Sequence, residues 1–385
     1  MSEKIAILAL LGTAAIPFIY YGIALFSCWR FFRRPRRQNG ARFMPPVSIL
    51  KPIRGLDPEA YENFASFCRQ DYPEYELLFC VGSEDDSALP LIDRLKREFP
   101  QREIRVLFGS GRDASNDKVA KLARLVSEAR HEYLVISDSD VRARPDYLQS
   151  VVAPLADAKI GAVTCFYVSI EDGSFVDRLQ SVGMMSDFYA GIVVAWQLDG
   201  VKFALGPTIA TTRERLAGFG GYESIENRPA DDLLVGRLIA DQGYEVELLR
   251  YPVETVADYQ SIRELMHKRL RWIVVMRYMR PWGHFGLLFT HGLPWSLAAV
   301  AIHPTPVTAV AYLGTYFAMR CAITGMIAIW GLRQHSYWRK MGLIPLWDAV
   351  AFLIWVASFA RRSIRWRGSD YYIREGTLVP VNSGE

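Results

Sequence analysis

Two carboxylates stand one residue apart at Asp138-Ser139-Asp140, directly after an apolar run at 133–137. Alternate residues of an extended segment point to the same side, so both carboxylates can face one ligand. Mg2+ and Mn2+ prefer oxygen ligands, and such an ion can neutralise the diphosphate of a sugar nucleotide. An acidic turn after a strand has the same residues, so the motif is weak by itself. Asp138 and Asp140 are therefore candidate ligands of a metal-bound diphosphate.

Two other polar groups follow or begin predicted elements. Glu84, Asp85 and Asp86 come directly after a second apolar run, where a carboxylate can bind the base or ribose of a nucleoside. Lys118 lies at the start of a predicted helix, where its ammonium group and the N–H groups of the first turn can bind a phosphate. Solvated loops have a similar composition, so neither group is specific when taken alone.

A further acidic pair, Asp231-Asp232, begins another predicted helix. Acids in a first turn often serve only to interact with the helix dipole. A carboxylate can also take the proton from an acceptor hydroxyl as its oxygen attacks an anomeric carbon. Asp232 is our candidate for the general base of an inverting sugar transfer.

An amphipathic segment at 262–279 contains Lys268-Arg-Leu-Arg271-Trp272. The planar guanidinium group of Arg271 can stabilise a departing diphosphate, and Trp272 can pack against the acceptor. Arginines at this place, between a soluble domain and apolar stretches, can equally contact lipid headgroups. Both interpretations stay open.

Short strands and helices that alternate along the chain must position these groups. The apolar, β-branched runs predict strands at 47–51, 75–81, 103–108, 133–137 and 160–168. The patterns between and after them predict helices at 58–69, 87–98, 118–129, 145–156, 175–198 and 231–242. Strands that alternate with helices are usually parallel, and ligands bind beyond their carboxyl ends. The sequence thus predicts a doubly wound α/β domain.

The uncharged run at 5–27 is long enough to cross a bilayer, and 51% of the chain is hydrophobic. Six arginines and no acid follow it: Arg30, Arg33, Arg34, Arg36, Arg37 and Arg42. Positive-inside topology explains this patch better than nucleic-acid binding. A secretory signal has its basic residues before a shorter apolar core, so we expect a retained anchor with the chain from Arg30 onward in the cytoplasm. The five cysteines are scattered and are expected to be buried thiols.

Three more apolar stretches follow at 285–302, 307–332 and 342–360. The connection at 333–340 and the tail at 361–367 are both basic, so both are expected in the cytoplasm, which three full crossings do not allow. We expect either the first or the last stretch to be re-entrant or interfacial. Arg320 and Asp348 fall inside two of the stretches, so they either pair or face protein or water at an interfacial depth.

These features predict six segments along the chain. They are a transmembrane anchor at 1–29, a basic cytoplasmic linker at 30–44, a catalytic domain at 45–260, an amphipathic interfacial segment at 261–284, C-terminal membrane helices at 285–360 and a basic cytoplasmic tail at 361–385.

Taken in order, the acids at 84–86, Asp138-Ser-Asp140, Asp231-Asp232 and the segment at 268–272 resemble a known motif series. It consists of three acidic motifs and (Q/R)xxRW, and it belongs to GT-A glycosyltransferases of families 2 and 21. The resemblance covers about residues 45–280 and is strongest to the ceramide glucosyltransferases of family 21. The segments that carry it are Val47-Ser-Ile-Leu-Lys-Pro-Ile-Arg-Gly55, Ser66-Phe-Cys-Arg-Gln-Asp-Tyr-Pro73 and Asn116-Asp-Lys118.

This resemblance implies a GT-A domain with transmembrane and interfacial helices, and inverting transfer of glucose from UDP-glucose to a ceramide hydroxyl. It also implies a divalent cation, Mg2+ or Mn2+, and a site on the cytosolic face of a membrane, such as a bacterial inner membrane. Carried over by position, the resemblance implies that Asp86 or its neighbours Glu84 and Asp85 bind uridine. It implies that Asp138 and Asp140 bind the ribose and the metal diphosphate and that Asp232 is the base. Arg271 and Trp272 then serve the leaving group and the acceptor.

Two departures from the family pattern concern Lys268 and Asp140. Lys268 stands where the motif has Gln or Arg, which keeps a donor but loses a planar one. Animal ceramide enzymes have Gly at the position of Asp140, so metal use can differ in detail.

Three other functions compete with ceramide glucosylation. A related bacterial group joins N-acetylglucosamine from its UDP donor to hopanoids and has similar motifs. Processive polysaccharide synthases need more spanning helices than this chain offers, and an inactive membrane scaffold would not need Asp140 and Asp232 together.

Overall fold

The computed structural model describes residues 2–35, 43–111, 114–170, 173–256, 261–366 and 369–381. The chain forms two compact units, each made from segments that are separate in sequence. The α/β unit comprises Pro35–Asp172, Gly200–Asp258 and Arg374–Glu385, and the helical unit comprises Met1–Arg34, Gly173–Asp199 and Tyr259–Ile373. Arg36, Arg37 and Arg42 of the expected basic linker lie outside the described residues. The division of the chain into six segments stays a prediction.

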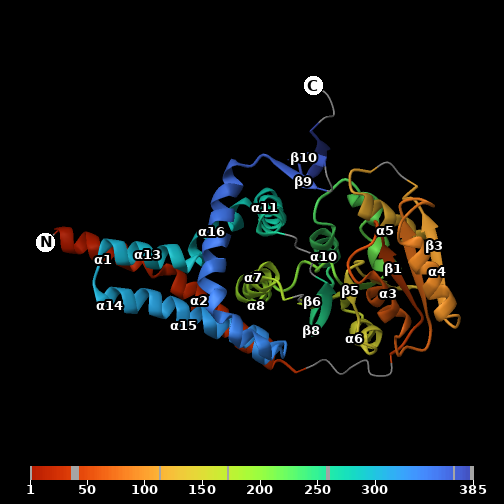
Figure 1. The fold of residues 1–385 in the computed structure, drawn as a ribbon, viewed down its shortest axis with the longest axis horizontal. Coiled ribbons are helices and arrows are strands. Elements are labelled where there is room, and N and C mark those ends of the chain that lie inside the picture. Colours follow the sequence, from red (N-terminus) through yellow and green to blue (C-terminus); the bar gives the residue numbers. More distant parts are fainter. Residues whose placement is uncertain are drawn as a thin grey trace. The chain divides into compact units, whose positions relative to one another are not determined.

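The α/β unit contains an eight-stranded sheet with the strand order β3-β2-β1-β4-β7-β6-β8-β5. Figure 1 labels β1, β3, β5, β6 and β8 of this sheet. The strands are β1 (Val47–Pro52), β2 (Tyr75–Val81), β3 (Glu103–Phe108), β4 (Tyr133–Ile136), β5 (Val141–Arg142), β6 (Ile160–Ile170), β7 (Ile209–Thr212) and β8 (Glu245–Val256). All five predicted strands are confirmed. Every residue of β1 and β2 is buried, which explains their near-continuous apolar sequences.

The sheet is rich in parallel pairs but mixed. β1 is parallel to β2 and β4, β2 to β3, and β6 to β8. β7 is antiparallel to β4 and β6, and β5 is antiparallel to β8. The sequence did not predict β7, because its four residues, Ile-Ala-Thr-Thr, do not stand out as an apolar run as those of β4 do.

Two helices of the α/β unit begin at candidate residues. The helices of this unit are α3 (Ala60–Cys68), α4 (Leu89–Glu98), α5 (Asp117–Glu128), α6 (Tyr147–Val152), α9 (Arg213–Ala217) and α10 (Asp231–Asp241), with 3-10 turns η1 (Ala153–Ala156) and η3 (Tyr222–Ile225). Lys118 lies in the first turn of α5, and Asp231 and Asp232 lie in that of α10. The helix expected from residue 58 begins two residues later, because Glu59 has a left-handed φ of 54°. α5 packs against β1 and β2, and α10 packs against β6 and β8.

The helical unit contains the apolar stretches. Its helices are α1 (Ser2–Ala14), α2 (Ile16–Arg33), α7 (Phe175–Gly183), α8 (Tyr189–Asp199), α11 (Ile262–Met279), α12 (Pro281–Gly286), α13 (Gly292–Ile302), α14 (Pro306–Ala309), α15 (Thr315–Thr324) and α16 (Ile344–Ala360). Shorter turns join them: η2 (Met184–Phe188), η4 (Leu287–Thr290), η5 (Val310–Gly314), η6 (Gly325–Gly331) and η7 (His335–Leu343). The helix predicted at 175–198 is confirmed, with the π-helical turn η2 inside it. After α16, β9 (Ser363–Trp366) and β10 (Ser369–Arg374) form an antiparallel pair.

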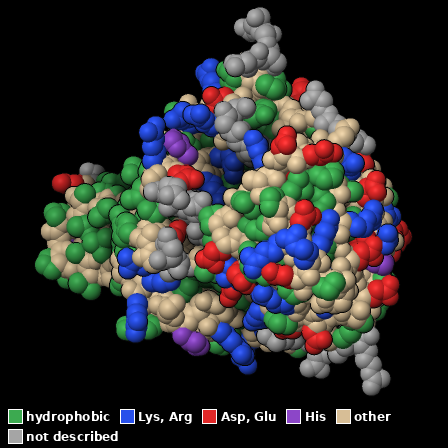
Figure 2. Space-filling model, turned by 45° about the vertical axis from the view of Figure 1, so that its right-hand side comes forward, with side chains coloured by type: hydrophobic (Ala, Val, Ile, Leu, Met, Phe, Trp, Pro, Cys, Tyr) green, Lys and Arg blue, Asp and Glu red, His purple; other side chains and the backbone are tan. Residues whose placement is uncertain are grey.

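Three helices among the described residues are long and apolar enough to cross a membrane: Glu3–Arg33, Pro306–Gly331 and His335–Ala360. The first of the three predicted C-terminal stretches is instead a helix pair bent by 50°, a broken span or a re-entrant loop. Tyr21 fills the break, since its hydroxyl donates to Thr290 O (3.1 Å) and accepts from Gly292 N (2.9 Å). Hydrophobic side chains cover the end of the helical unit at the left of Figure 2, as expected for a lipid-facing surface.

A buried ion pair joins two of the apolar helices. Arg320 Nη2 lies 2.5 Å from Asp348 Oδ1, and Arg320 Nε donates to Asp348 Oδ2 over 2.8 Å. Tyr316 also donates to Asp348 Oδ2 (2.7 Å), and Arg320 Nη1 donates to Ser186 O. Of the two alternatives left open for Arg320 and Asp348, the structure shows the pair, and the forked geometry satisfies both groups away from water.

Candidate active site

Lys118 joins two carboxylates that come from distant parts of the chain. Its Nζ lies 2.7 Å from Asp138 Oδ1 and 3.3 Å from Asp231 Oδ2. Lys118 belongs to the first turn of α5, Asp138 follows the carboxyl end of β4, and Asp231 begins α10. Burial disfavours the ammonium charge, but the carboxylates of Asp138, Asp231 and Asp232 outweigh that effect and raise the pKa of Lys118. The centre of the site is therefore a permanent cation among acids.

Gly206 lies next to the carboxylates of both Asp138 and Asp232. Its N–H donates to Asp232 Oδ2 over 3.0 Å, and a Cβ atom at residue 206 would lie 3.2 Å from Asp138 Oδ2 and 3.3 Å from Asp232 Oδ2. Leu233 N donates to the other oxygen, Asp232 Oδ1, over 2.9 Å. The candidate base is thus held by two backbone N–H groups, and a Cβ at residue 206 would press on both carboxylates, which would have to shift by a few tenths of an ångström.

Burial raises the pKa of Asp232 to about 6, and the neighbouring charge of Asp231 acts in the same direction. Lys118 lowers this pKa but does not cancel the effect. A carboxylate with a pKa near 6 is still ionised at neutral pH, yet it binds a proton more readily than an ordinary aspartate. This combination suits a general base.

Lys51 supports the turn that contains the two predicted metal ligands. The buried Nζ of this residue donates to Asp138 O over 2.8 Å and to Ser137 Oγ over 3.4 Å, and it lies 3.8 Å from the centre of the Phe67 ring. Burial lowers the pKa of Lys51 to about 7, against the opposing charges of Asp138 and Asp140. The sequence analysis did not assign Lys51 a role, although a lysine inside an apolar strand was a visible signal.

Asp138 and Asp140 are both partly exposed at the end of β4. No group of three or more His, Cys, Asp or Glu side chains suited to a metal occurs among the described residues. Mg2+ is commonly held by one or two carboxylates and completed by substrate phosphates and water. The two hard oxygen donors fit a cation of that kind, which would complete its coordination with the diphosphate.

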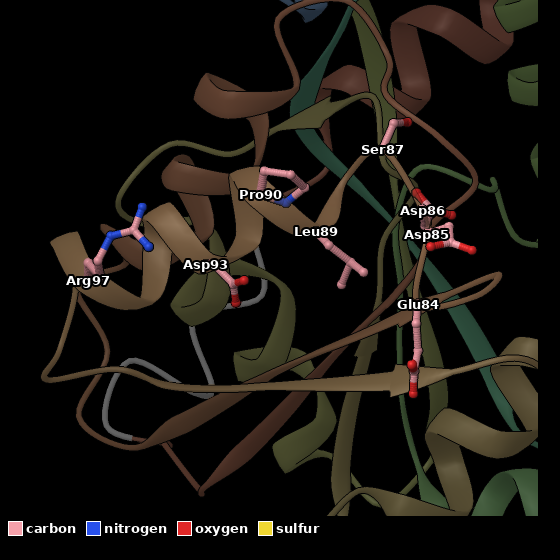
Figure 3. A pocket seen from close by; sticks show the side chains of 8 residues that line it. All are labelled: Glu84, Asp85, Asp86, Ser87, Leu89, Pro90, Asp93 and Arg97. Atoms are coloured by element: carbon pink, nitrogen blue, oxygen red, sulfur yellow. The ribbon is translucent and has the colours of Figure 1, made fainter.

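Glu84, Asp85 and Asp86 line an open cavity of about 570 Å3 together with Ser87, Leu89, Pro90, Asp93 and Arg97 (Figure 3). Asp86 Oδ2 accepts from Gly82 N (3.2 Å) and Asp86 Oδ1 accepts from Ala88 N (3.0 Å), so this carboxylate shapes its own loop. In Figure 3 the Glu84 side chain points in a different direction from those of Asp85 and Asp86. Lys118, Asp138 and Asp232 are not among the residues that line this cavity.

Arg271 and Trp272 belong to α11 in the helical unit, which begins at the N-cap residue Ser261, whose Oγ accepts from Glu264 N. Arg269 is the buried anchor of this motif: its Nε and Nη2 donate to Gln180 Oε1 over 3.0 and 2.7 Å. Its guanidinium group lies 4.7 Å from the ring centre of Trp272. Lys268 is exposed and Arg271 is partly buried. Sequence analysis missed Arg269, because the periodic pattern does not show which arginine faces Gln180.

The sequence pattern of glycosyl transferase family 21 matches residues 9–379. This chain belongs to glycosyl transferase family 21. The family assignment covers both units and confirms the resemblance found in the sequence. The chain is therefore a glycosyltransferase.

Two relatives of this family 21 enzyme come from Caenorhabditis elegans. Ceramide glucosyltransferase 3 is 22% identical over 393 residues, covering 98% of this chain and 84% of the relative. Ceramide glucosyltransferase 1 is 24% identical over 280 residues, covering 72% and 60%. Among solved structures, a mannosyltransferase from Pyrobaculum calidifontis in complex with GDP-Man and Mn2+ has a TM-score of 0.56 and 22% identity, covering 90% of this chain and 99% of its own. The likeness confirms the GT-A fold.

Proposed function

We propose that this family 21 enzyme transfers glucose from UDP-glucose to the hydroxyl of a membrane lipid, ceramide in the first place, with inversion at the anomeric carbon. The relatives named ceramide glucosyltransferases support this donor and acceptor. The observation that carries the proposal is Asp232, a carboxylate with a pKa of about 6 that backbone N–H groups hold beside Asp138. The products are glucosylceramide and UDP.

Asp232 acts as the general base in this reaction. The lipid hydroxyl oxygen forms a bond to the anomeric carbon while the bond from that carbon to the diphosphate oxygen breaks. The hydroxyl proton passes to Asp232, and the bonding electron pair leaves with UDP. The N–H groups of Gly206 and Leu233 fix the orientation of the carboxylate before the acceptor arrives.

The donor is bound mainly by acids and one lysine. Asp138 and Asp140 hold Mg2+ or Mn2+, which supplies positive charge to the diphosphate, and a solved structure of this fold was obtained with Mn2+ and GDP-Man. Lys118 exchanges its contact with Asp138 for the diphosphate oxygens. Glu84, Asp85 and Asp86 bind the uridine, and their open cavity supports that role.

Arg271 stabilises the departing diphosphate, and Trp272 packs against the acceptor. The support is their place in α11, whose buried Arg269 fixes the helix through Gln180 and thereby the direction of its other side chains. A guanidinium group suits a leaving diphosphate because it donates two parallel hydrogen bonds.

We place the enzyme in a membrane, with the catalytic site in the cytoplasm of a bacterial cell or an equivalent compartment. The crossings are the helix Glu3–Arg33, the bent pair that ends in α13, and the helix Pro306–Gly331. We infer that α16 lies at the interface, since its contacts include the charged amphipathic helix α11 as well as α7, α13 and α15. With three crossings the basic segments at 28–42, 333–340 and 361–367 all lie on the cytoplasmic side.

The test is to incubate the full chain in detergent, with Mg2+ or Mn2+, with ceramide and lipid extracts and with one UDP-sugar at a time. The expected product is a ceramide whose mass has increased by one hexose, formed from UDP-glucose. Asp232→Asn should form none, whereas Asp241→Asn, an exposed acid on the same helix, should match the wild type. Transfer of N-acetylhexosamine to another lipid, or no transfer at all, would refute the proposed donor and acceptor.

A further inference from the structure

The loop at 226–228, just before the helix that begins with Asp231 and Asp232, is tied to two distant segments. Asn116 N donates to Glu226 O (3.1 Å), and Ser115 N donates to Asn227 Oδ1 (2.9 Å). Asn116 Nδ2 donates to Arg228 O (3.1 Å), and Leu378 N donates to Asn227 O (2.8 Å). Each residue of the loop therefore accepts at least one hydrogen bond from a segment more than a hundred positions away in the sequence.

We propose that Asn227 is a positioning residue of the transferase site, and that the C-terminal strand β11 (Thr377–Pro380) acts on the site through it. Asn227 uses its side chain to bind the segment before α5 and its backbone carbonyl to bind β11. It thus connects the helix of Lys118, the helix of Asp232 and the end of the chain. The activity part of this proposal rests on the proposed function.

The link to α5 concerns Lys118. Asn116 is the N-cap residue of α5, is 2% exposed, and sits two positions before Lys118. Both its N–H group and its side-chain amide are bound by the loop at 226–228. A displacement of that loop would move the start of α5 and change the distances from Lys118 to Asp138 and Asp231.

The link to α10 concerns the candidate base. Ala230, between the loop and α10, has a left-handed backbone with φ 56° and ψ 57°. A non-glycine residue adopts this conformation only when its surroundings enforce it, at a cost of about 1–3 kcal/mol. The four hydrogen bonds of the preceding loop supply such a constraint, so the direction in which α10 begins depends on them.

The link to β11 brings in a part of the chain that follows all the apolar helices. Leu378 belongs to the α/β unit and is 2% exposed, so its side chain is buried while its N–H group donates to Asn227 O. The segment after α16 therefore makes a specific contact with the loop at 226–228. Through β11 it completes the support of the loop that precedes Asp231 and Asp232.

The test compares two matched pairs of variants in the full chain. Asn227→Asp keeps an oxygen that accepts from Ser115 N, whereas Asn227→Leu has no acceptor. Leu378→Met keeps the backbone N–H group and a side chain of similar size, whereas Leu378→Pro lacks the N–H group. We expect Asn227→Leu and Leu378→Pro to lower kcat about 10- to 100-fold, with smaller changes in the KM for UDP-glucose. The conservative partner of each pair should recover most of that loss.

Hydrogen exchange of the backbone at 222–234 provides a readout that does not need activity. Exchange should be faster in Asn227→Leu and Leu378→Pro than in the wild type, and close to the wild type in Asn227→Asp and Leu378→Met. Unchanged exchange in Leu378→Pro would overturn the coupling, even if activity fell. A wild type that transfers no glucose would refute the proposed function, and the exchange data would still decide whether β11 supports the loop.

Discussion

The raised pKa of Asp232 predicts an acid limb in the pH profile of kcat/KM, with its midpoint at about pH 6. The base must be ionised to accept a proton, so activity falls as the pH drops through that pKa. At about one pH unit below the midpoint roughly a tenth of the carboxylates stay ionised, so kcat/KM should fall about tenfold. Glucose transfer at low UDP-glucose, measured between about pH 4.5 and 8, gives this profile for the free enzyme.

Removal of either of two neighbouring charges should shift the midpoint of the acid limb, in opposite directions for the two charges. Lys118 lowers the pKa of Asp232, so Lys118→Met should move the limb to higher pH, whereas Asp231 raises that pKa, so Asp231→Asn should move it to lower pH. The midpoint, and not the maximal rate, is compared, because both residues also affect the rate. Shifts in the same direction in both variants would refute the assignment of this limb to Asp232.

The same pKa separates a catalytic role from a structural one. A carboxyl group whose pKa is raised by folding destabilises the folded state when it is ionised. For Asp232 this loss of stability begins above the pKa of the unfolded chain and is complete above about pH 6. Asp232→Asn should lose about 100-fold or more in kcat, while its melting temperature at pH 7.5 should change little, because removal of the buried charge offsets the loss of an acceptor for one of the N–H groups of Gly206 and Leu233. Loss of activity together with a clearly lower melting temperature would indicate a structural role.

Three further predictions concern other contacts. Asp140→Asn should weaken metal-dependent UDP binding at least about tenfold without changing metal-independent binding, and equal affinities in titration calorimetry would contradict the metal assignment. Gly206→Ala should lower kcat about tenfold or more because its Cβ would displace a carboxylate, whereas Gly191→Ala, with open space around it, should not. Arg320→Asp should destabilise the enzyme by about 3–5 kcal/mol, and adding Asp348→Arg should restore much of the loss; a double variant no more stable than the single one would show that the pair itself does not stabilise the protein.

The sequence was informative where a residue type conflicted with its surroundings. Acids directly after apolar runs at 138–140 and at the start of a helix at 231–232 are visible without a structure, and the structure brings Asp138 and Asp231 to the same lysine. Charged residues inside apolar stretches are equally visible, so the pairing of Arg320 with Asp348 could be considered before the fold was known.

Other residues that shape the candidate site cannot be recognised from the sequence around them. Gly206 matters because two carboxylates lie close to the place of its missing side chain, and Asn227 matters because it binds residues 115 and 378. Neither the composition nor the periodicity around these residues differs from that of an ordinary loop. Contacts of this kind depend on the way the chain returns to the sheet, as does the short antiparallel strand β7.

Hydropathy alone does not decide whether α16 crosses the membrane. The helix His335–Ala360 passes the length and composition test for a span as clearly as Glu3–Arg33 does. In Figure 1, however, α16 runs across the direction of α13, α14 and α15, which lie beside α1 and α2. Its neighbours include α11, an amphipathic helix with many charges, and Arg277 of α11 donates to Ser358 O near the end of α16. We therefore propose that α16, held by a charged neighbour, lies at the membrane surface, which would leave both basic segments around it on the proposed cytoplasmic side.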